Sequence, residues 1–150
     1  MNDAALYTNI ISSILKQIND FRTENMAGST YFDWDAHAQA DELPEGDLIG
    51  PAGCGMTHEE SGIHVVFGIG VATGGDPNLF RMRALMSKLY GLFKPQTSIP
   101  ILDADTGDVL SWMVIRTPVS ILPAAKAQIR SVQFFNATAL IDPGATSSLR

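Results

Sequence analysis

The stretch that decides the fold is residues 62–94, GIHVVFGIGVATGGDPNLFRMRALMSKLYGLFK. Every second position of its first half is apolar, which predicts a strand with one apolar face. That face carries Ile63, Val65, Phe67, Ile69 and Val71. Gly68 and Gly70 fall on the opposite face, which leaves room for a helix or another backbone to approach closely. Asp76 and Pro77 then supply an N-cap and a first helical residue, and the apolar spacing that follows predicts a helix over residues 77–93.

Upstream of this stretch, residues 4–22 carry a single apolar stripe at spacings of three and four. We therefore predict a helix there, with Asp3 as its N-cap. The aromatic segment TYFDW at residues 30–34 predicts a short strand. Residues 41–55 are rich in acids, glycine and proline, which predicts a loop with one extended piece at residues 47–49.

Downstream, residues 99–102 and 109–116 flank the polar turn DADTGD and predict a hairpin. Pro118 and Pro123 flank a looser connection, and residues 130–141 alternate as a final strand with a phenylalanine on each face. The fold class is therefore α+β, with a mainly antiparallel sheet and two principal helices packed on one face. We expect a single domain over residues 1–141 and a flexible C-terminal tail over residues 142–150.

Composition limits the classes of function. The chain has 150 residues, of which 17% are charged against a typical ~25%, and this shortfall indicates surface that is buried against partners. The net charge of −6 disfavours a protein that gains affinity by neutralising phosphates. The start MNDAALYTNI lacks the features of a secretory signal, and no apolar run approaches the length of about 18 residues that spans a bilayer. We expect a soluble protein made in a reducing cytoplasm, without membrane contact.

Two local patterns are candidates for nucleotide binding or for a nucleophilic thiol. The glycines at 68 and 70 resemble a dinucleotide-binding turn, but Thr73 stands where the third glycine belongs. Cys54 has no activating motif nearby, which favours a structural or incidental thiol. Neither pattern predicts a catalytic residue or a cofactor.

Two further patterns are weak candidates for metal binding. Asp103, Asp105 and Asp108 fall within six residues, but the glycine and glutamate of a calcium loop are not at their required positions. His58 is followed by Glu59 and Glu60 but lacks the second histidine of a zinc-hydrolase motif, and His64 reaches it only through the fold. We expect no metal, and keep a small metal-dependent hydrolase or calcium-binding module as an alternative.

The distribution of charge is more informative than these motifs. Residues 23–80 contain ten acidic residues and no lysine or arginine, whereas residues 81–150 contain eight basic and four acidic residues. Opposite charge on two parts of one subunit suits head-to-tail contacts that close into a ring. The alternative is that the charges only solvate the surface. An acidic excess also suits the wall of a channel through which DNA slides without sticking.

The order of elements resembles that of the tail terminator proteins of long-tailed bacteriophages. The likeness covers residues 4–141: an amphipathic helix, the aromatic segment at 30–34, an acidic loop, the strand and helix of residues 63–93, and closing antiparallel strands. It implies a non-enzymatic subunit of a hexameric ring in the virion, at the tail–neck junction. Such a ring caps the tail tube, stops its polymerisation and offers a surface for head joining.

The same resemblance implies the partners: further copies of the chain, the tail tube protein and a head–tail connector or neck protein, with DNA passing through unbound. Residues 41–61 and 117–125 have no counterpart in the family pattern, which leaves open a neighbouring neck or tail-completion protein. From charge position alone, we expect Arg81 and Arg83 on one side of the subunit contact. Asp33 and Asp35 are the expected acidic counterpart on the other side.

Overall fold

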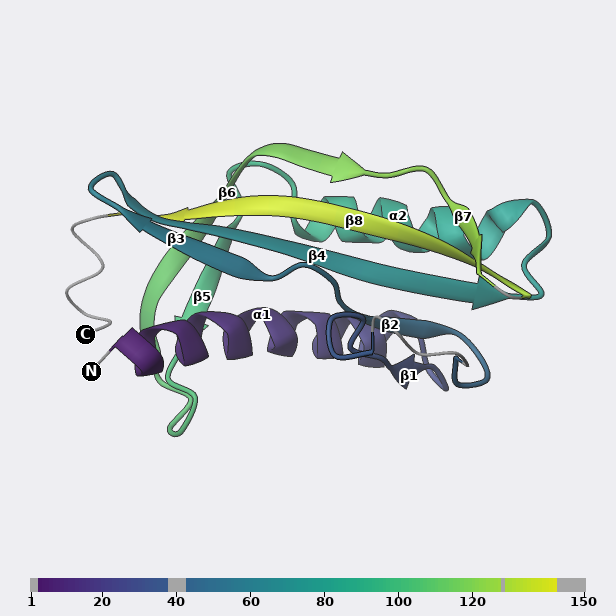
Figure 1. Ribbon diagram of the computed structural model, residues 1–150, viewed down its shortest axis with the longest axis horizontal. Coiled ribbons are helices and arrows are strands. Elements are labelled where there is room, and N and C mark those ends of the chain that lie inside the picture. Colours follow the sequence, from purple (N-terminus) through teal and green to yellow (C-terminus); the bar gives the residue numbers. More distant parts are fainter. Residues whose placement is uncertain (1–2, 38–42, 128, 143–150) are drawn as a thin grey trace.

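The two strands predicted at residues 62–72 and 130–141 form the middle of the sheet. In the computed structural model, which describes residues 3–37, 43–127 and 129–142, β4 (Gly62–Gly74) pairs antiparallel with β8 (Arg130–Ile141) over its length. The register runs from Ile63 opposite Ile141 to Gly74 opposite Arg130. These two strands are the longest pairing of one eight-stranded, curled sheet (Figure 1).

The other strands extend the sheet on both sides in the order β1-β2-β4-β8-β6-β5. Their bounds are β1 (Thr30–Tyr31), β2 (Leu48–Pro51), β3 (Gly55–Glu59), β5 (Ser98–Leu102), β6 (Val109–Ile121) and β7 (Ala125–Ala127). β3 pairs with β4 beside β2, and β7 pairs with β8. Only β1 and β2 run parallel, so the sheet is mainly antiparallel as the sequence predicts.

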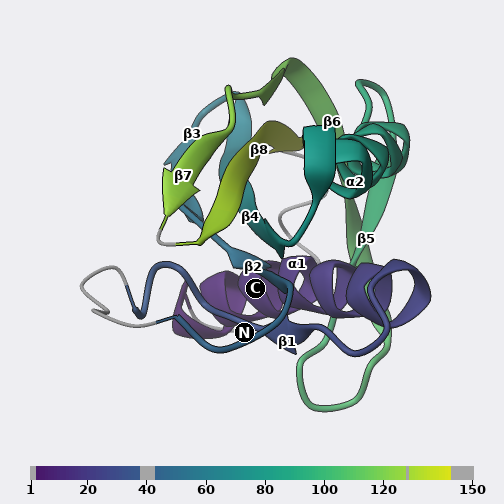
Figure 2. The same cartoon turned by 90° about the vertical axis from the view of Figure 1, so that its right-hand side faces the viewer.

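Both principal helices pack on the face of β4 that the sequence marks as apolar. α1 (Asp3–Asn25) lies against β2 and β5, and α2 (Phe80–Leu92) lies against β4 and β8 (Figure 2). A short 3₁₀ turn, η1 (Pro77–Leu79), precedes α2. One continuous core unites the buried side chains of both helices with the odd-numbered positions of β4, from Ile63 to Val71. The α+β fold class, with its helices on one face, is therefore confirmed.

The opposite face of β4 is covered at one end by the segment that follows β1. Phe32, Leu48, Ala72 and Val132 form a second, smaller cluster there, with Trp34 packed against it. The Trp34 indole N–H donates to the carbonyl oxygen of Gly70 at 2.9 Å, and any side chain at Gly70 would collide with the indole ring. A side chain at Gly68 would collide with the carbonyl oxygen of Ala52. The close approach of another backbone is confirmed at Gly68, whereas at Gly70 the close neighbour is the Trp34 side chain.

Several element boundaries differ from the sequence predictions. The first helix is longer than residues 4–22 and includes Asp3, which was expected as its N-cap. The extended piece predicted at residues 47–49 corresponds to β2. The predicted loop of residues 41–55 ends at the first residue of β3, and no strand was predicted over the rest of β3. The looser connection predicted between Pro118 and Pro123 is shorter than expected, because β6 continues to Ile121 and only residues 122–124 separate it from β7.

Two further differences are smaller. The strand predicted at residues 30–34 is regular only over β1, although the N–H groups of Phe32 and Trp34 still donate to Ile49 and Pro51. The predicted second helix begins as the 3₁₀ turn η1. Residues 143–150 of the predicted tail lie outside the described residues. No helix in the described part of the chain is long and apolar enough to cross a membrane.

Candidate subunit interface

Arg81, predicted as a subunit contact, is held within its own subunit. Its Nε donates to Asp47 Oδ2 at 2.8 Å and its Nη2 to Asp47 Oδ1 at 2.9 Å, a two-pronged ion pair. Nη2 also donates to the carbonyl oxygen of Gly74 at 2.7 Å. The hydrogen bonds to Asp47 raise the pKa of the Arg81 guanidinium further. Arg81 therefore ties the start of α2 to the loop before β2 and to the end of β4.

The start of α2 is capped by Asp76 from four residues away. Asn78 and Leu79 both have left-handed backbones, with φ of 58° and 56°, and Leu79 has no side-chain oxygen to cap the helix. The Asp76 carboxylate instead accepts the N–H of Arg81 through Oδ1 and that of Met82 through Oδ2, both at 2.9 Å. Asp76 Oδ2 also accepts the Thr73 hydroxyl at 2.9 Å. The capping carboxylate predicted at Asp76 is thus confirmed, but it acts on the α-helix beyond η1.

The charge of Asp76 is stabilised by the groups that it caps. Partial burial opposes ionisation, but the N–H groups of Arg81 and Met82, the Thr73 hydroxyl and the Arg81 guanidinium outweigh it and lower the pKa of the carboxyl. A lowered pKa means that the ionised form favours the folded state. Together with the Arg81–Asp47 ion pair, this carboxylate fixes the start of α2, which forms one wall of the groove described below.

We expect Asp76→Ala to destabilise the protein by about 1 kcal/mol at neutral pH, the usual loss for a helix cap. The part that depends on charge is complete above the pKa of the unfolded chain, about 3.9, and disappears as the pH falls through the lower pKa of the folded protein. The difference in the free energy of unfolding between the Asp76→Ala variant and the wild type, measured with urea, should therefore become smaller in acid. Asp105→Ala removes an exposed carboxylate that accepts no hydrogen bond from any described residue, and it serves as the control. An equal effect of both substitutions at all pH values would contradict the cap.

Arg83 lies beside a groove between α2 and the end of β6. Its Nη1 donates to the carbonyl oxygen of Asn78 at 3.0 Å. The groove has a volume of about 370 Å³ and is lined by Arg83, Met86, Ser87, Tyr90, Ile121 and Gln133. Tyr90 is 46% exposed and Ile121 is 41% exposed, so large apolar surface faces solvent here. We call this feature the α2–β6 groove.

Asp33 and Asp35, predicted as the acidic counterpart, have local partners. Asp33 Oδ1 accepts the N–H groups of Asp35 and Ala36, both at 3.0 Å. Asp35 Oδ1 accepts the N–H of Gly53 at 2.7 Å, and Oδ2 lies 3.4 Å from the N–H nitrogen of Cys54. The two carboxylates thus hold the turn after β1 against the turn before β3. Within one subunit the structure does not bring them to Arg81 or Arg83, and their role in a subunit contact stays a prediction.

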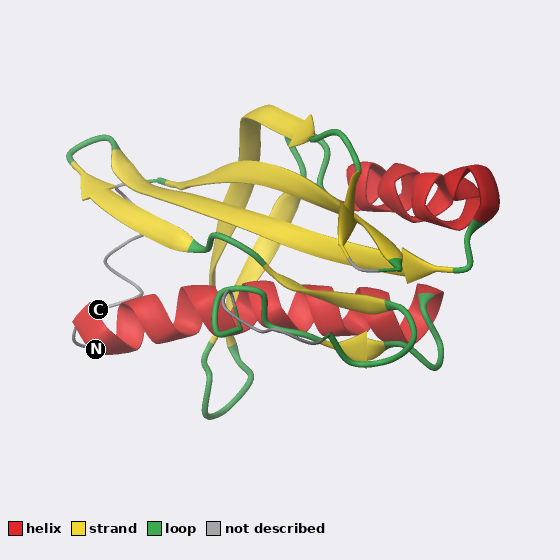
Figure 3. Cartoon of the chain, turned by 45° about the vertical axis from the view of Figure 1, so that its right-hand side comes forward, coloured by secondary structure: helices red, strands yellow, loops and turns green. Residues whose placement is uncertain are grey.

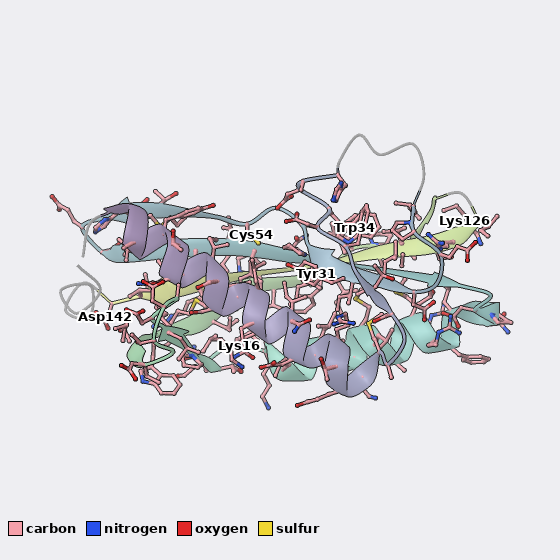
Figure 4. The ribbon with its side chains drawn as sticks, turned by 90° about the horizontal axis from the view of Figure 1, so that it is seen from below. Lys16, Tyr31, Trp34, Cys54, Lys126 and Asp142 are labelled. Atoms are coloured by element: carbon pink, nitrogen blue, oxygen red, sulfur yellow. The ribbon has the colours of Figure 1, made fainter. Side chains whose placement is uncertain are left out.

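A second exposed apolar surface lies on the sheet face away from both helices. Val66, Trp112, Val114 and Leu140 project there from three neighbouring strands, and we call them the outer-face patch. Trp112 is 52% exposed and Val66 is 46% exposed. Arg116 and Asp142 join Trp112, Val114 and Leu140 around a cavity of about 230 Å³. Figure 4 shows Asp142 at the opposite end of the molecule from Lys126 on β7.

The structure separates the residues of the metal-site alternative. His64 is opposite Thr57 and His58 is opposite Ile63, so the two histidines project from opposite faces of the β3–β4 hairpin. Asp103 Oδ1 accepts the N–H groups of Asp105 and Thr106 at 2.8 and 3.0 Å, which closes the turn on itself. Among the described residues no three His, Cys, Asp or Glu side chains lie together as a metal site.

Cys54 is half-buried beside β3. Burial raises the pKa of its thiol to about 11, and the carboxylates of Asp35 and Asp33 act in the same direction against the hydrogen bond to the backbone of Gly68. The thiol is therefore protonated at neutral pH, which is its less nucleophilic form.

No family model matches the sequence, and no curated protein matches it either. Fourteen chains of solved structures do match. One of them aligns over 90% of this chain and 95% of its own length, with a TM-score of 0.55 and 11% sequence identity, and its name states no activity. At this identity the likeness concerns the fold alone.

Most of the surface of the α2–β6 groove and the outer-face patch was not predicted from the sequence. Arg83 and Tyr90 lie seven residues apart, so helical spacing already places them on one side of α2. Trp112 and Val114 alternate within a predicted strand, which already places them on one face. Two contacts could not be predicted from local sequence: Ile121 and Gln133 lie beside α2, and Leu140 lies beside Val114. Both depend on the order and register of the strands.

Proposed function

We propose that this chain is one subunit of a homo-oligomeric ring of the tail terminator type, at the junction of tail and neck in a long-tailed bacteriophage. Such a ring caps the tail tube, stops its polymerisation and offers the surface to which the head joins. The observation that carries the proposal is the exposure of two different apolar surfaces, the α2–β6 groove and the outer-face patch. They lie on opposite faces of the sheet.

Two unlike surfaces favour a ring over a two-fold dimer. A two-fold dimer buries the same patch of both subunits, so one self-complementary surface is enough. Two different surfaces on opposite faces suit head-to-tail contacts, in which each copy presents one surface to the other surface of the next. The charge distribution agrees with this arrangement, since residues 23–80 contain ten acidic residues and no lysine or arginine, whereas residues 81–150 carry a basic excess.

The proposed partners follow from the position in the virion. The axial faces of the ring meet the tail tube protein and a head–tail connector or neck protein. A net charge of −6 keeps passing DNA from binding to the ring. The protein then acts by binding, with no catalytic group or cofactor. A neck or tail-completion protein of the same junction is the alternative function.

The oligomeric state tests the class of function. We expect light scattering and electron micrographs of the purified protein to show annuli of uniform diameter and the mass of a hexamer. Some rings close only on a template, so the same measurement is repeated with tail tubes present. A protein that is a monomer at tens of micromolar, alone and with tubes, would contradict the proposal.

Addition to growing tail tubes separates the two junction functions. A terminator bound to the tube end stops elongation, so tube length should depend on when the protein is added. A neck or completion protein would bind finished tails without changing the length of growing ones.

A further inference from the structure

We infer that the α2–β6 groove of one copy receives the tip of the β3–β4 hairpin of the next copy, with Arg83 facing Glu60. The inference rests on the proposed ring and identifies the elements that join its subunits. The partner is therefore a second copy of this chain.

The groove offers hydrogen-bond donors above an apolar floor. Met86 and Ile121 supply the apolar surface, whereas Arg83, Ser87, Tyr90 and Gln133 supply polar groups. Gln133 already donates to the carbonyl oxygen of Leu122 at 2.8 Å. Arg83 is exposed and donates to a single described acceptor, the carbonyl oxygen of Asn78, so its guanidinium keeps further N–H donors at the edge of the groove. The groove is therefore suited to an occupant that brings an acidic side chain to Arg83.

The β3–β4 hairpin has the complementary chemistry. Residues 57–61 at its tip are all exposed, and two of them are Glu59 and Glu60. Glu59 is occupied in its own subunit, since its Oε2 lies 3.4 Å from His64 Nε2 and 3.5 Å from Ser61 Oγ. Glu60 makes no ion pair or side-chain hydrogen bond with any residue in the described ranges. Its carboxylate is therefore available to a guanidinium of another copy.

The position of the two elements makes this a contact between copies. The hairpin projects at one end of the long axis, and α2 with the end of β6 lies toward the other (Figures 1 and 3). Ile141, beside the hairpin, and Gln133, in the groove, are eight residues apart on β8, or about 27 Å at 3.4 Å per residue. At this distance the tip of the β3–β4 hairpin cannot reach the α2–β6 groove of its own subunit. The hairpin of one copy therefore enters the groove of the next, and the copies join head to tail.

The outer-face patch continues the hairpin side of the contact. Val66 lies on β4 opposite Gly55 of β3, and Leu140 lies opposite His64, so the patch begins at the base of the hairpin. Strand addition through β5 is a less suitable way to join copies. Pro100 has no N–H to donate, and the N–H of Leu102 already donates to Ser13 Oγ of α1 at 2.9 Å.

Charge reversal on each side tests the contact. Glu60→Arg and Arg83→Glu should each raise the protein concentration needed for half-assembly at least tenfold in low salt, and less in high salt, where exposed charges are screened. Glu45→Arg and Lys94→Glu reverse exposed charges elsewhere and should leave assembly unchanged. Circular dichroism and thermal unfolding verify that every variant is folded.

Mixing the two variants is the decisive measurement. In a mixture, the intact Glu60 of one variant meets the intact Arg83 of the other, and the two substituted side chains, an arginine and a glutamate, also attract each other. Assembly should therefore recover in the mixture and in the Glu60→Arg/Arg83→Glu double variant. The contact is wrong if wild-type rings form and both single variants assemble normally, or if neither the mixture nor the double variant recovers. Failure of the wild type to form rings under any condition would instead overturn the proposed function.

Discussion

Gly50→Ala is expected to destabilise the fold by about 3 kcal/mol or more, because a methyl group at this position has no space. A Cβ at Gly50 would overlap the carbonyl carbon and oxygen of Phe32 and lie 3.2 Å from the amide nitrogen of Asp33. These are backbone atoms, which cannot rotate away as a flexible side chain does. The Phe32 N–H also donates to Ile49 at 2.9 Å, which holds the segment against β2. Urea unfolding measures the loss.

Gly91→Ala is the matched control for Gly50→Ala. Gly91 lies in α2, an added Cβ meets nothing within 4 Å, and its backbone needs no positive φ. Alanine should stabilise this position by about 0.5–1 kcal/mol, since glycine loses more backbone entropy in a helix. If Gly50→Ala unfolds at the same urea concentration as the wild type, the close crossing of Phe32 over β2 is incorrect.

The importance of Gly50 has no signal in the sequence, whereas that of Gly68 and Gly70 does. Gly68 and Gly70 interrupt one face of a strongly alternating strand, so a close approach is the natural interpretation. Gly50 lies among acids, glycines and prolines that predict a loop. β2 is a strand because it pairs with β1 on one side and with β4 on the other, and this tertiary pairing outweighs local composition.

The strands that the sequence analysis missed lie at edges of the sheet. β3 is mostly exposed, so it lacks the apolar alternation that marks β4 and β8. Pro118 predicts a break, yet β6 continues through it to Ile121. β5 pairs with β6 only as far as Val114, and on the side of β8 the register shifts between Arg116 and Ser120, so Pro118 lies where the ladder is already interrupted.

The candidate interface could be predicted only in part, because it also depends on how the strands pair. The charge imbalance is a property of local sequence, and from charge position alone it indicated both Arg81 and Arg83. The commitment of Arg81 to Asp47, 34 residues away, depends on how β2 aligns with β4 and has no local signal. The hairpin that we assign to the groove requires β3, which was not predicted, and so its role emerged only from the structure.

Phe93→Ala is expected to cost about 3–5 kcal/mol, the range for removing a fully buried phenylalanine. Phe93 follows the last residue of α2 and is 1% exposed. Its ring centroid lies 5.3 Å from that of Phe67 on β4 and 6.0 Å from that of Phe135 on β8. Alanine leaves a cavity between the end of α2 and these two central strands, because the strands are held by the β4–β8 pairing and cannot collapse into the space.

Phe80→Ala, at the other end of α2, is the control for Phe93→Ala. Phe80 begins α2 and is 71% exposed, so its truncation should change the free energy of unfolding by no more than about 0.5 kcal/mol. The two phenylalanines have the same side chain and differ only in burial. The difference between the free energies of unfolding of the two variants, from thermal and urea unfolding, therefore measures how much the burial of Phe93 anchors α2. Because Met86 and Tyr90 of the α2–β6 groove lie between them, Phe93→Ala should also weaken assembly at temperatures where the variant is still folded. Equal stability of the two variants would show that α2 is not anchored through Phe93, and the groove would then lack the rigid wall that the proposed subunit contact needs.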